Sequence, residues 1–353
     1  MRPYFYAFLL AILGLACQTQ DKASQATTSS TQSSQPSLTF TAVPFAKQNS
    51  YRGLHWTNDS TVWLSGSNGS ILVSNNAGQS WDSLNTPTNQ DYRSIWVLDN
   101  GTIITAPAGQ PAAIFTTSSN GEIWQEVYNN DNEAAFFDAI HFVDENTGFA
   151  FSDPVEGEFL LLKTNDGGAT WHQEKTIPDA WPGEAGFAAS NASIASSDGN
   201  LFIGTGGSQS RIFKHNITSK GWQVNTISTK FNSEAGGIYA MATQNNRYGI
   251  VAVGGAYDQP NDSTGTAFYS HDSGKSWQAA KTLPKGYLSG VANIPGTTIF
   301  VGVGTRGTQV SFDAGVHWQE INNYSLNTIR FNPSGTIGLA VGSKGRLYKV
   351  EIN

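Results

Sequence analysis

The sequence predicts an all-β chain that folds into a seven-bladed β-propeller of four-stranded antiparallel blades. Three observations support this prediction. A short turn phrase that ends in tryptophan recurs along the chain, short apolar strands precede each copy, and the composition is rich in glycine (37 residues) and aromatic residues (12%). Helical periodicity is not evident in the chain. Recurrence of one unit at long, fairly even spacing is typical of repeat architectures, and a spacing of 41 to 55 residues suits four-stranded blades.

Residues 1–37 precede the repeats. The run from Tyr4 to Ala16 carries no charge and is too short to span a bilayer, so residues 1–16 are predicted to be a signal peptide. It ends in Leu-Gly-Leu-Ala before Cys17, the only cysteine, and this segment resembles a bacterial lipobox. The resemblance implies that Cys17 is lipidated and anchors the protein in the bacterial cell envelope, at the outer membrane or facing the periplasm. An ordinary secretory signal with an incidental cysteine is the alternative.

Residues 17–37 are nearly all Ser, Thr, Gln, Ala, Asp and Lys, a composition that predicts a flexible tether because it cannot bury a core. The globular domain is predicted to span residues 38–353. Its first strand, residues 38–43, is expected to supply the strand that the last repeat lacks, which closes the ring and covers both open edges. The seven repeats are expected to begin at Tyr51, Tyr92, Phe136, Gly186, Gly237, Tyr287 and Leu326.

The turn phrase has the pattern [ST]-x-[DNS]-x-G-x-x-W, with a degenerate copy that ends at Trp222. A short carboxylate or amide at its third position accepts hydrogen bonds from nearby backbone N–H groups, and glycine takes a positive φ without a Cβ clash. The closing tryptophan adds a large apolar surface that can wedge between blades. The phrase is therefore interpreted as a hairpin turn with a core anchor. The structural residues are Asn76, Asp166, Asp272 and Asp313 at the third position, and Trp81, Trp124, Trp171, Trp277 and Trp318 at the end.

These residues resemble the Asp-box, or BNR repeat, of sialidases, sortilin-type receptors, two-propeller xyloglucanases and photosystem II assembly and stability factors. The resemblance implies a propeller hairpin and no catalytic group. In repeat count, in the placement of the phrase and in the glycines before the third strand, the domain looks most like the photosystem II assembly and stability factor family. Members of that family use an arginine-rich patch to bind a membrane-protein partner, and no such patch is evident in this chain, which has eight arginines.

Candidate binding residues lie in the loops that enter the innermost strands and in those between the second and third strands of each blade, because both sets share one face of a propeller. Loops are also the preferred place for binding residues. Arg52 and Arg93 are the strongest candidates, since both follow a tyrosine at the same repeat position. The full set of candidates is Tyr51, Arg52, Tyr92, Arg93, Asp138, Arg211, Tyr257, Tyr287, Arg306 and Arg346.

Several classes of function are disfavoured by the sequence. A net charge of −7 argues against a nucleic-acid partner, which would need a basic stripe. The six histidines lack the spacing of metal ligands, and each turn phrase has at most one acidic group, so neither a zinc nor a calcium site is expected. None of the glycine clusters opens a helix, so no cofactor is expected either.

Two functions remain from different classes. The preferred one is a non-catalytic, monomeric envelope lipoprotein whose propeller loops bind a protein or glycan partner, in the assembly or stabilisation of a membrane complex. The alternative is a sialidase-like or other glycoside hydrolase that uses the channel mouth. The sialidase resemblance requires an arginine triad beside a Tyr–Glu pair and an Arg-Ile-Pro phrase, and the sequence Thr-Ile-Arg330-Phe is the nearest approach, without proline. No residue is assigned a catalytic role.

Overall fold

The computed structural model describes residues 36–45, 47–228, 233–244 and 249–353. The chain divides into two compact units, Met1–Pro36 and Ser37–Asn353, and every described strand belongs to the second. The predicted signal peptide, Cys17 and nearly all of the predicted tether lie outside the described residues. Within the described residues no helix has the length and hydropathy needed to cross a membrane.

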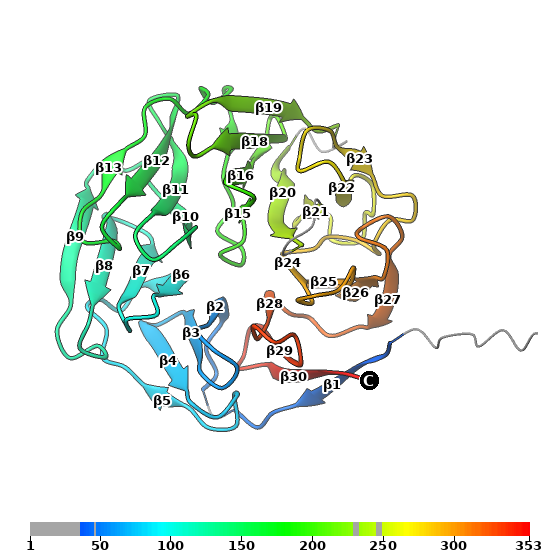
Figure 1. Cartoon of the computed structure of the whole chain (residues 1–353), viewed down its shortest axis with the longest axis horizontal. Coiled ribbons are helices and arrows are strands. Elements are labelled where there is room, and N and C mark those ends of the chain that lie inside the picture. Colours follow the sequence, from blue (N-terminus) through cyan, green and yellow to red (C-terminus); the bar gives the residue numbers. More distant parts are fainter. Residues whose placement is uncertain (1–35, 46, 229–232, 245–248) are drawn as a thin grey trace, which may run out of the picture. The chain divides into compact units, whose positions relative to one another are not determined.

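The second unit is a propeller of seven sheets arranged around a ring, as predicted (Figure 1). In the first six blades, four antiparallel strands follow one another in chain order from the centre of the ring outward. The first three blades are β2 (Tyr51–Trp56), β3 (Val62–Gly66), β4 (Ser70–Ser74) and β5 (Asp82–Ser83); β6 (Asp91–Val97), β7 (Ile103–Ala108), β8 (Ala112–Thr117) and β9 (Gln125–Asn130); and β10 (Phe137–Phe142), β11 (Gly148–Val155), β12 (Glu158–Thr164) and β13 (His172–Gln173).

The next three blades continue this pattern, and the fifth carries two extra short strands, β14 (Glu184–Ala185) and β17 (Gly206–Gly207), at its inner edge. Their strands are β15 (Ile194–Ser197), β16 (Asn200–Gly204), β18 (Arg211–Asn216) and β19 (Trp222–Thr226); β20 (Ser233–Thr243), β21 (Ile250–Ala256), β22 (Ala267–Ser270) and β23 (Gln278–Ala279); and β24 (Gly290–Asn293), β25 (Phe300–Gly304), β26 (Gly307–Ser311) and β27 (Gln319–Asn322).

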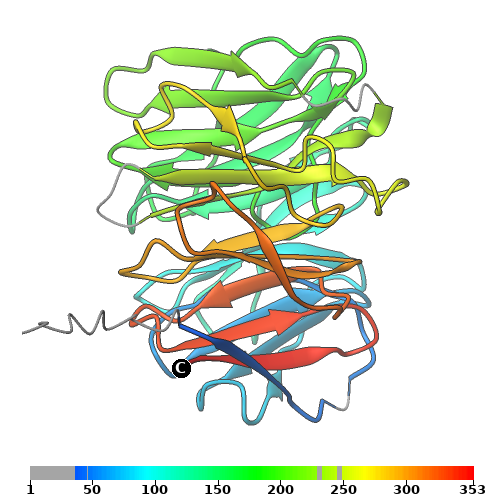
Figure 2. The same cartoon turned by 90° about the vertical axis from the view of Figure 1, so that its right-hand side faces the viewer.

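The seventh blade joins the two ends of the unit. It contains β28 (Thr328–Phe331), β29 (Ile337–Val341), β30 (Leu347–Ile352) and, as its outermost strand, β1 (Leu38–Ala42). β1 pairs antiparallel with β30, with Phe40 opposite Val350, and Figure 2 shows the dark-blue strand lying along the red ones. The predicted closing strand is thus confirmed, and it covers what would otherwise be an open sheet edge.

The turn phrases fold as the sequence predicts. In the third blade Thr164 Oγ1 donates to Asp166 Oδ1 (2.7 Å), and the same Asp166 oxygen accepts the Thr170 N–H (2.9 Å). The Trp171 indole then donates to the Gly168 carbonyl (3.1 Å). These bonds use backbone groups that a tight turn leaves unpaired, and the Gly167 N–H also ties the hairpin to the Asn146 carbonyl in the turn between β10 and β11 (3.0 Å).

The glycine of the phrase also docks its blade onto the preceding one. At Gly168 (φ +87°) a Cβ atom would lie 3.1 Å from Ile104 of the second blade, and at Gly274 (φ +71°) it would collide with Phe202 of the fourth. Glycine is therefore required twice, for the left-handed conformation and for the close approach of two blades. The buried apolar clusters span neighbouring blades accordingly, so the core is a ring of blade interfaces.

The expected start of the fourth repeat at Gly186 is wrong. The innermost strand of that blade is β15, which begins at Ile194, and residues 187–193 before it, which we call the plug segment, are largely buried. The Asn191 side chain accepts the Ile140 N–H (2.8 Å) and donates to the Ile95 carbonyl (3.1 Å). The Ala192 carbonyl accepts the Met241 N–H (2.7 Å) of β20. The plug segment therefore joins the innermost strands of three other blades at the centre of the ring.

Candidate functional site

A cavity of 360 Å³ lies at the centre of the ring, on the face where the chain enters the innermost strands. We call this face the entry face and the cavity the mouth pocket. Its floor is the plug segment, which contributes Phe187, Ala188 and Ala189. Its walls come from the innermost strands and from loops of five other blades, and the side chains that matter for binding are Arg52, Arg93, Tyr239, Tyr257, Tyr287 and Asn327.

β-Bulges aim the key side chains into this region. The pairing of β2 with β3 shifts between Tyr51 and Gly53, so Arg52 is the extra residue, and the same shift makes Arg93 the extra residue in β6. Asp138 and Tyr239 occupy the corresponding bulges of β10 and β20. A bulge re-aims one side chain without ending the strand, which explains why equivalent repeat positions converge on the ring centre.

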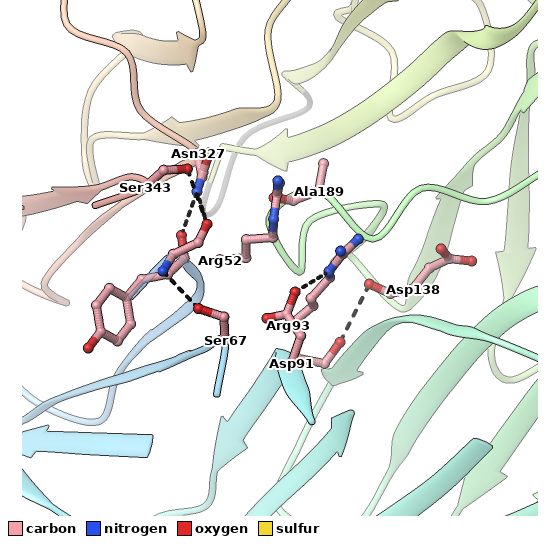
Figure 3. Close-up of polar contacts among 11 residues, drawn as sticks. Arg52, Ser67, Asp91, Arg93, Asp138, Ala189, Asn327 and Ser343 are labelled. Carbon is pink, nitrogen blue, oxygen red and sulfur yellow. Dashed lines mark hydrogen bonds and ion pairs between the residues drawn. The ribbon is translucent and has the colours of Figure 1, made fainter. Parts of the chain in front are cut away.

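Arg52 lies at the boundary between the pocket and the plug segment. One of its terminal nitrogens donates to the Ala189 carbonyl (2.9 Å), and Figure 3 shows the two residues beside each other. Burial and the neighbouring charge of Arg93 lower the pKa of Arg52, and Tyr287 and Asp91 act in the opposite direction. Within the described residues no carboxylate lies within ion-pair distance of Arg52. Its charge is therefore available to an anionic group of a ligand.

Arg93 is oriented by a carboxylate on its own strand. Its Nε donates to Asp91 Oδ2 (2.8 Å; Figure 3). Its guanidinium lies 6.0 Å from the centre of the Phe136 ring. The side chains of Arg93 and Asp91 are 32% and 25% exposed, so the pair is accessible to solvent, and Arg93 lines the pocket. Among the described residues that line the pocket there are two arginines and no carboxylate, in a chain whose overall charge is −7.

Aromatic rings form the other side of the pocket. Phe187 of the plug segment stacks on Tyr239 with ring centres 3.8 Å apart, and Tyr239 meets Tyr287 edge-on at 4.8 Å. The Tyr239 hydroxyl donates to the Ala235 carbonyl (2.7 Å), which fixes the ring. Tyr257 is 59% exposed at the rim. Rigid aromatic surface beside arginine is the composition that binding hot spots favour.

Asp138 and Asp153 form an acidic pair near Arg93. Asp138 is 1% exposed and its Oδ2 has no hydrogen-bond partner, and burial followed by the charge of Asp153 raises the pKa of Asp138 well above its usual value. Burial raises the pKa of Asp153 to about 6, although its Oδ1 accepts the Gly186 N–H at 2.8 Å. The buried carboxyl of Asp138 therefore favours its neutral form, whereas Asp153 is ionised above about pH 6.

The other predicted site residues lie elsewhere. Tyr51 and Tyr92 are fully buried, and their hydroxyls bond Ser70 and Thr88 within their own blades, so neither lines the pocket. Arg211 is buried in an ion pair with Glu184 (Nε to Oε1, 2.8 Å). The remaining two predicted residues, Arg306 and Arg346, are exposed in loops of the sixth and seventh blades and do not line the mouth pocket.

Sequence reasoning missed the plug segment as part of the site. Its signal was the run of small residues Ala188, Ala189 and Ser190, which lies between Trp171 and Trp222. It also missed Trp181, which is 57% exposed on the loop that leads into β14. Among the described residues no cluster of three or more His, Cys, Asp or Glu side chains could hold a metal ion.

Comparison with known proteins supports the fold. No model of a known protein family matches the sequence, and no curated protein matches it. Among solved structures, YCF48 bound to D1 peptide aligns with a TM-score of 0.61 and 14% identity, over 88% of this chain and 96% of that one. YCF48 from Cyanidioschyzon merolae gives 0.61 and 15%, over 88% and 98% of the two chains.

A protein of a different kind aligns equally well. The structure of U3-55K has a TM-score of 0.60 and 12% identity, over 88% of this chain and 98% of that chain. Because proteins with such different names are similar to this chain to the same extent, the comparison establishes the propeller fold and not a function.

Proposed function

We propose that this protein is a non-catalytic binding scaffold whose mouth pocket takes a carboxylate-bearing segment of a protein partner. The observation that carries the proposal is the pair Arg52 and Arg93 beside the ring cluster of Tyr239, Tyr257 and Tyr287. Arginine recognises carboxylates through its planar fork, and tyrosine supplies contact area at a low cost in conformational entropy. The peptide-bound YCF48 structure supports this reading to the extent that a propeller of similar fold binds a peptide.

The lipoprotein and envelope assignments belong to the same proposal. The apolar run before Cys17 and the polar composition of residues 18–37 support a lipid anchor followed by a tether. The repeated phrases support membership among Asp-box propellers through their sequence pattern. In this proposal the domain is held near a membrane of the bacterial envelope and takes part in the assembly or stabilisation of a membrane complex there.

The glycoside hydrolase alternative has less support. The sialidase resemblance requires three arginines that converge beside a tyrosine and a glutamate. Among the described residues the mouth pocket has two arginines, and no glutamate lines it. The buried acid Asp138 is covered by Gly186, where a Cβ atom would collide with its Oδ2. A glycan partner that stacks on the tyrosines is an outcome that the following experiment would reveal.

The experiment is crosslinking capture of the native protein from its own envelope, read by mass spectrometry. The test variant is Arg52→Glu/Arg93→Glu, and the matched control is Arg306→Glu/Arg346→Glu, which makes the same change of charge at exposed arginines outside the pocket. The proposal predicts a protein that is captured by the parent and the control and lost in the test variant. Equal capture by all three proteins, or no partner in any, would contradict it.

A further inference from the structure

A second cavity, of 370 Å³, opens at the other end of the ring centre. It is lined by the ends of the innermost strands and by Pro295 and Pro333, which lie in the turns after β24 and β28. Successive strands of a blade run in opposite directions, so these turns share a face with the tryptophan-ended turn phrases. We call it the turn face. The plug segment, whose Asn191 lines this cavity, also forms the floor of the mouth pocket.

Equivalent positions in four blades supply the polar and aromatic lining of this cavity. The four residues are His55, Trp96, His141 and Arg330. Each lies four positions after an apolar residue at the start of its innermost strand or just before it, namely Tyr51, Tyr92, Phe137 and Leu326. The ring centres of His55 and Trp96 are 4.5 Å apart, and those of Trp96 and His141 are 5.0 Å apart. Three neighbouring blades thus present one continuous aromatic wall.

Arg330 supplies the only fixed charge of this cavity within the described residues. Its terminal nitrogens donate to the carbonyls of Ile329 (2.9 Å), Val291 (3.3 Å), Asn191 (3.3 Å) and Ser190 (3.5 Å), so among the described residues its Nε–H is the donor left for a ligand. No described carboxylate lies within ion-pair distance of it, and no Asp or Glu lines the cavity. Carbonyl groups orient a cation but do not neutralise it, so an anion in the cavity would gain a charge-assisted bond.

The histidines do not add charge at neutral pH. Burial lowers the pKa of His55 to about 4 and that of His141 to about 3, and the charge of Arg330 contributes to both shifts. His55 Nε2 lies 3.0 Å from the Val97 carbonyl, so that nitrogen carries the proton and the ring stays neutral. Burial lowers the pKa of Arg330 to about 10, which leaves it charged at pH 7. The site therefore combines one cation with a flat, neutral surface.

We propose that the turn-face cavity binds a small carboxylate that carries a flat ring, with the carboxylate beside Arg330 and the ring against the wall of His55, Trp96 and His141. The cavity volume fits a ligand of this size, and apolar walls with a few placed polar groups are typical of small-molecule sites. This inference does not depend on the proposed function of the mouth pocket, because the two cavities are lined by different side chains.

The test is a calorimetric titration of the full chain with benzoate and with benzamide, which has nearly the same shape and no charge. We expect benzoate to bind with a Kd of about 1 mM or below. Benzamide should bind at least about tenfold more weakly, since it lacks the charge-assisted bond. Equal affinities for the two probes, or no binding of benzoate at about 10 mM, would overturn the proposal.

Variants locate the site. Arg330→Met should abolish benzoate binding, but Arg330 also holds the plug segment and this variant could fail to fold. Ala242 lines the same cavity and is not part of the plug segment, so Ala242→Asp places a competing carboxylate there, with Ala242→Asn as a neutral control of the same size. We expect Ala242→Asp to weaken benzoate binding at least about tenfold more than Ala242→Asn does, with both variants folded by circular dichroism. Unchanged binding in Ala242→Asp would overturn the proposal.

Discussion

The buried ion pair between Arg211 and Glu184 positions the loop that leads to the plug segment. The Glu184 side chain is 0% exposed and that of Arg211 is 7% exposed. Glu184 Oε2 also accepts the Trp181 N–H (3.0 Å), and Arg211 donates to the Asp179 carbonyl (2.6 Å). Breaking such a pair from one side leaves a buried charge without its partner, which costs about 3–5 kcal/mol. Arg211→Met should therefore destabilise the protein by this amount.

The assay is urea denaturation followed by near-UV circular dichroism, with a thermal scan beside it. A loss of about 3–5 kcal/mol corresponds to a fall in Tm of roughly 4–8 °C for a unit as large as Ser37–Asn353, because the entropy of unfolding grows with chain length. The double variant Arg211→Met/Glu184→Gln should recover part of the loss, because it removes the second charge as well. A loss below about 1 kcal/mol in Arg211→Met, or a double variant no more stable than the single one, would refute the reasoning.

Three further predictions concern pH, the turn phrases and the closing strand. Burial raises the pKa of Asp153 to about 6, so the stability contributed by its neutral carboxyl is present below the pKa of the unfolded state and is lost as the pH rises through about 6. Asp153→Asn should therefore be more stable than the parent at about pH 7.5 and equal to it near pH 4. A difference between their urea midpoints that does not vary with pH would contradict this. Gly274→Ala should lower the free energy of unfolding by about 1–3 kcal/mol more than Gly101→Ala does. Both glycines have a positive φ, but a Cβ atom at Gly274 would meet Phe202, whereas nothing lies within 4 Å of one at Gly101. Equal losses of stability in urea denaturation would exclude the packing explanation. Removal of Leu38–Ala42 should expose the edge of β30 and cause self-association in analytical ultracentrifugation, and a monomer with unchanged Tm would show that β1 does not protect this edge.

The fold was predictable because its turn signals are local. The hydroxyl and carboxylate of a turn phrase bond groups within the phrase, as in the bonds from Thr164 and Thr170 to Asp166, so the local sequence predicts the hairpin. The fourth repeat was placed wrongly because the bonds of the plug segment are long-range. Asn191 is held by Ile95 and Ile140, which lie 96 and 51 residues away in the chain, and no local pattern reveals such partners.

The candidate site was only partly predictable for a related reason. Arg52 and Arg93 were found because they share a repeat position, and the structure brings both to the mouth pocket. Tyr51 and Tyr92 directly precede these arginines but are buried, because successive residues of a strand face opposite sides. The bulge directs only the arginines to the ring centre. The turn-face cavity escaped notice because its residues, such as His55 and Trp96, become related only when the repeats are aligned at the end of the innermost strand.

Tyr257 offers the most direct test of the central claim, which is that the mouth pocket binds a protein partner. A photo-crosslinking amino acid would replace Tyr257 at the rim of the pocket and, as a control, Ile123, which is 69% exposed in a turn phrase of the second blade. Illumination of the native envelope should yield a protein adduct from position 257, absent from position 123 and abolished by Arg52→Glu/Arg93→Glu. Adducts of equal yield from both positions, or an adduct at 257 that survives the double substitution, would contradict the account.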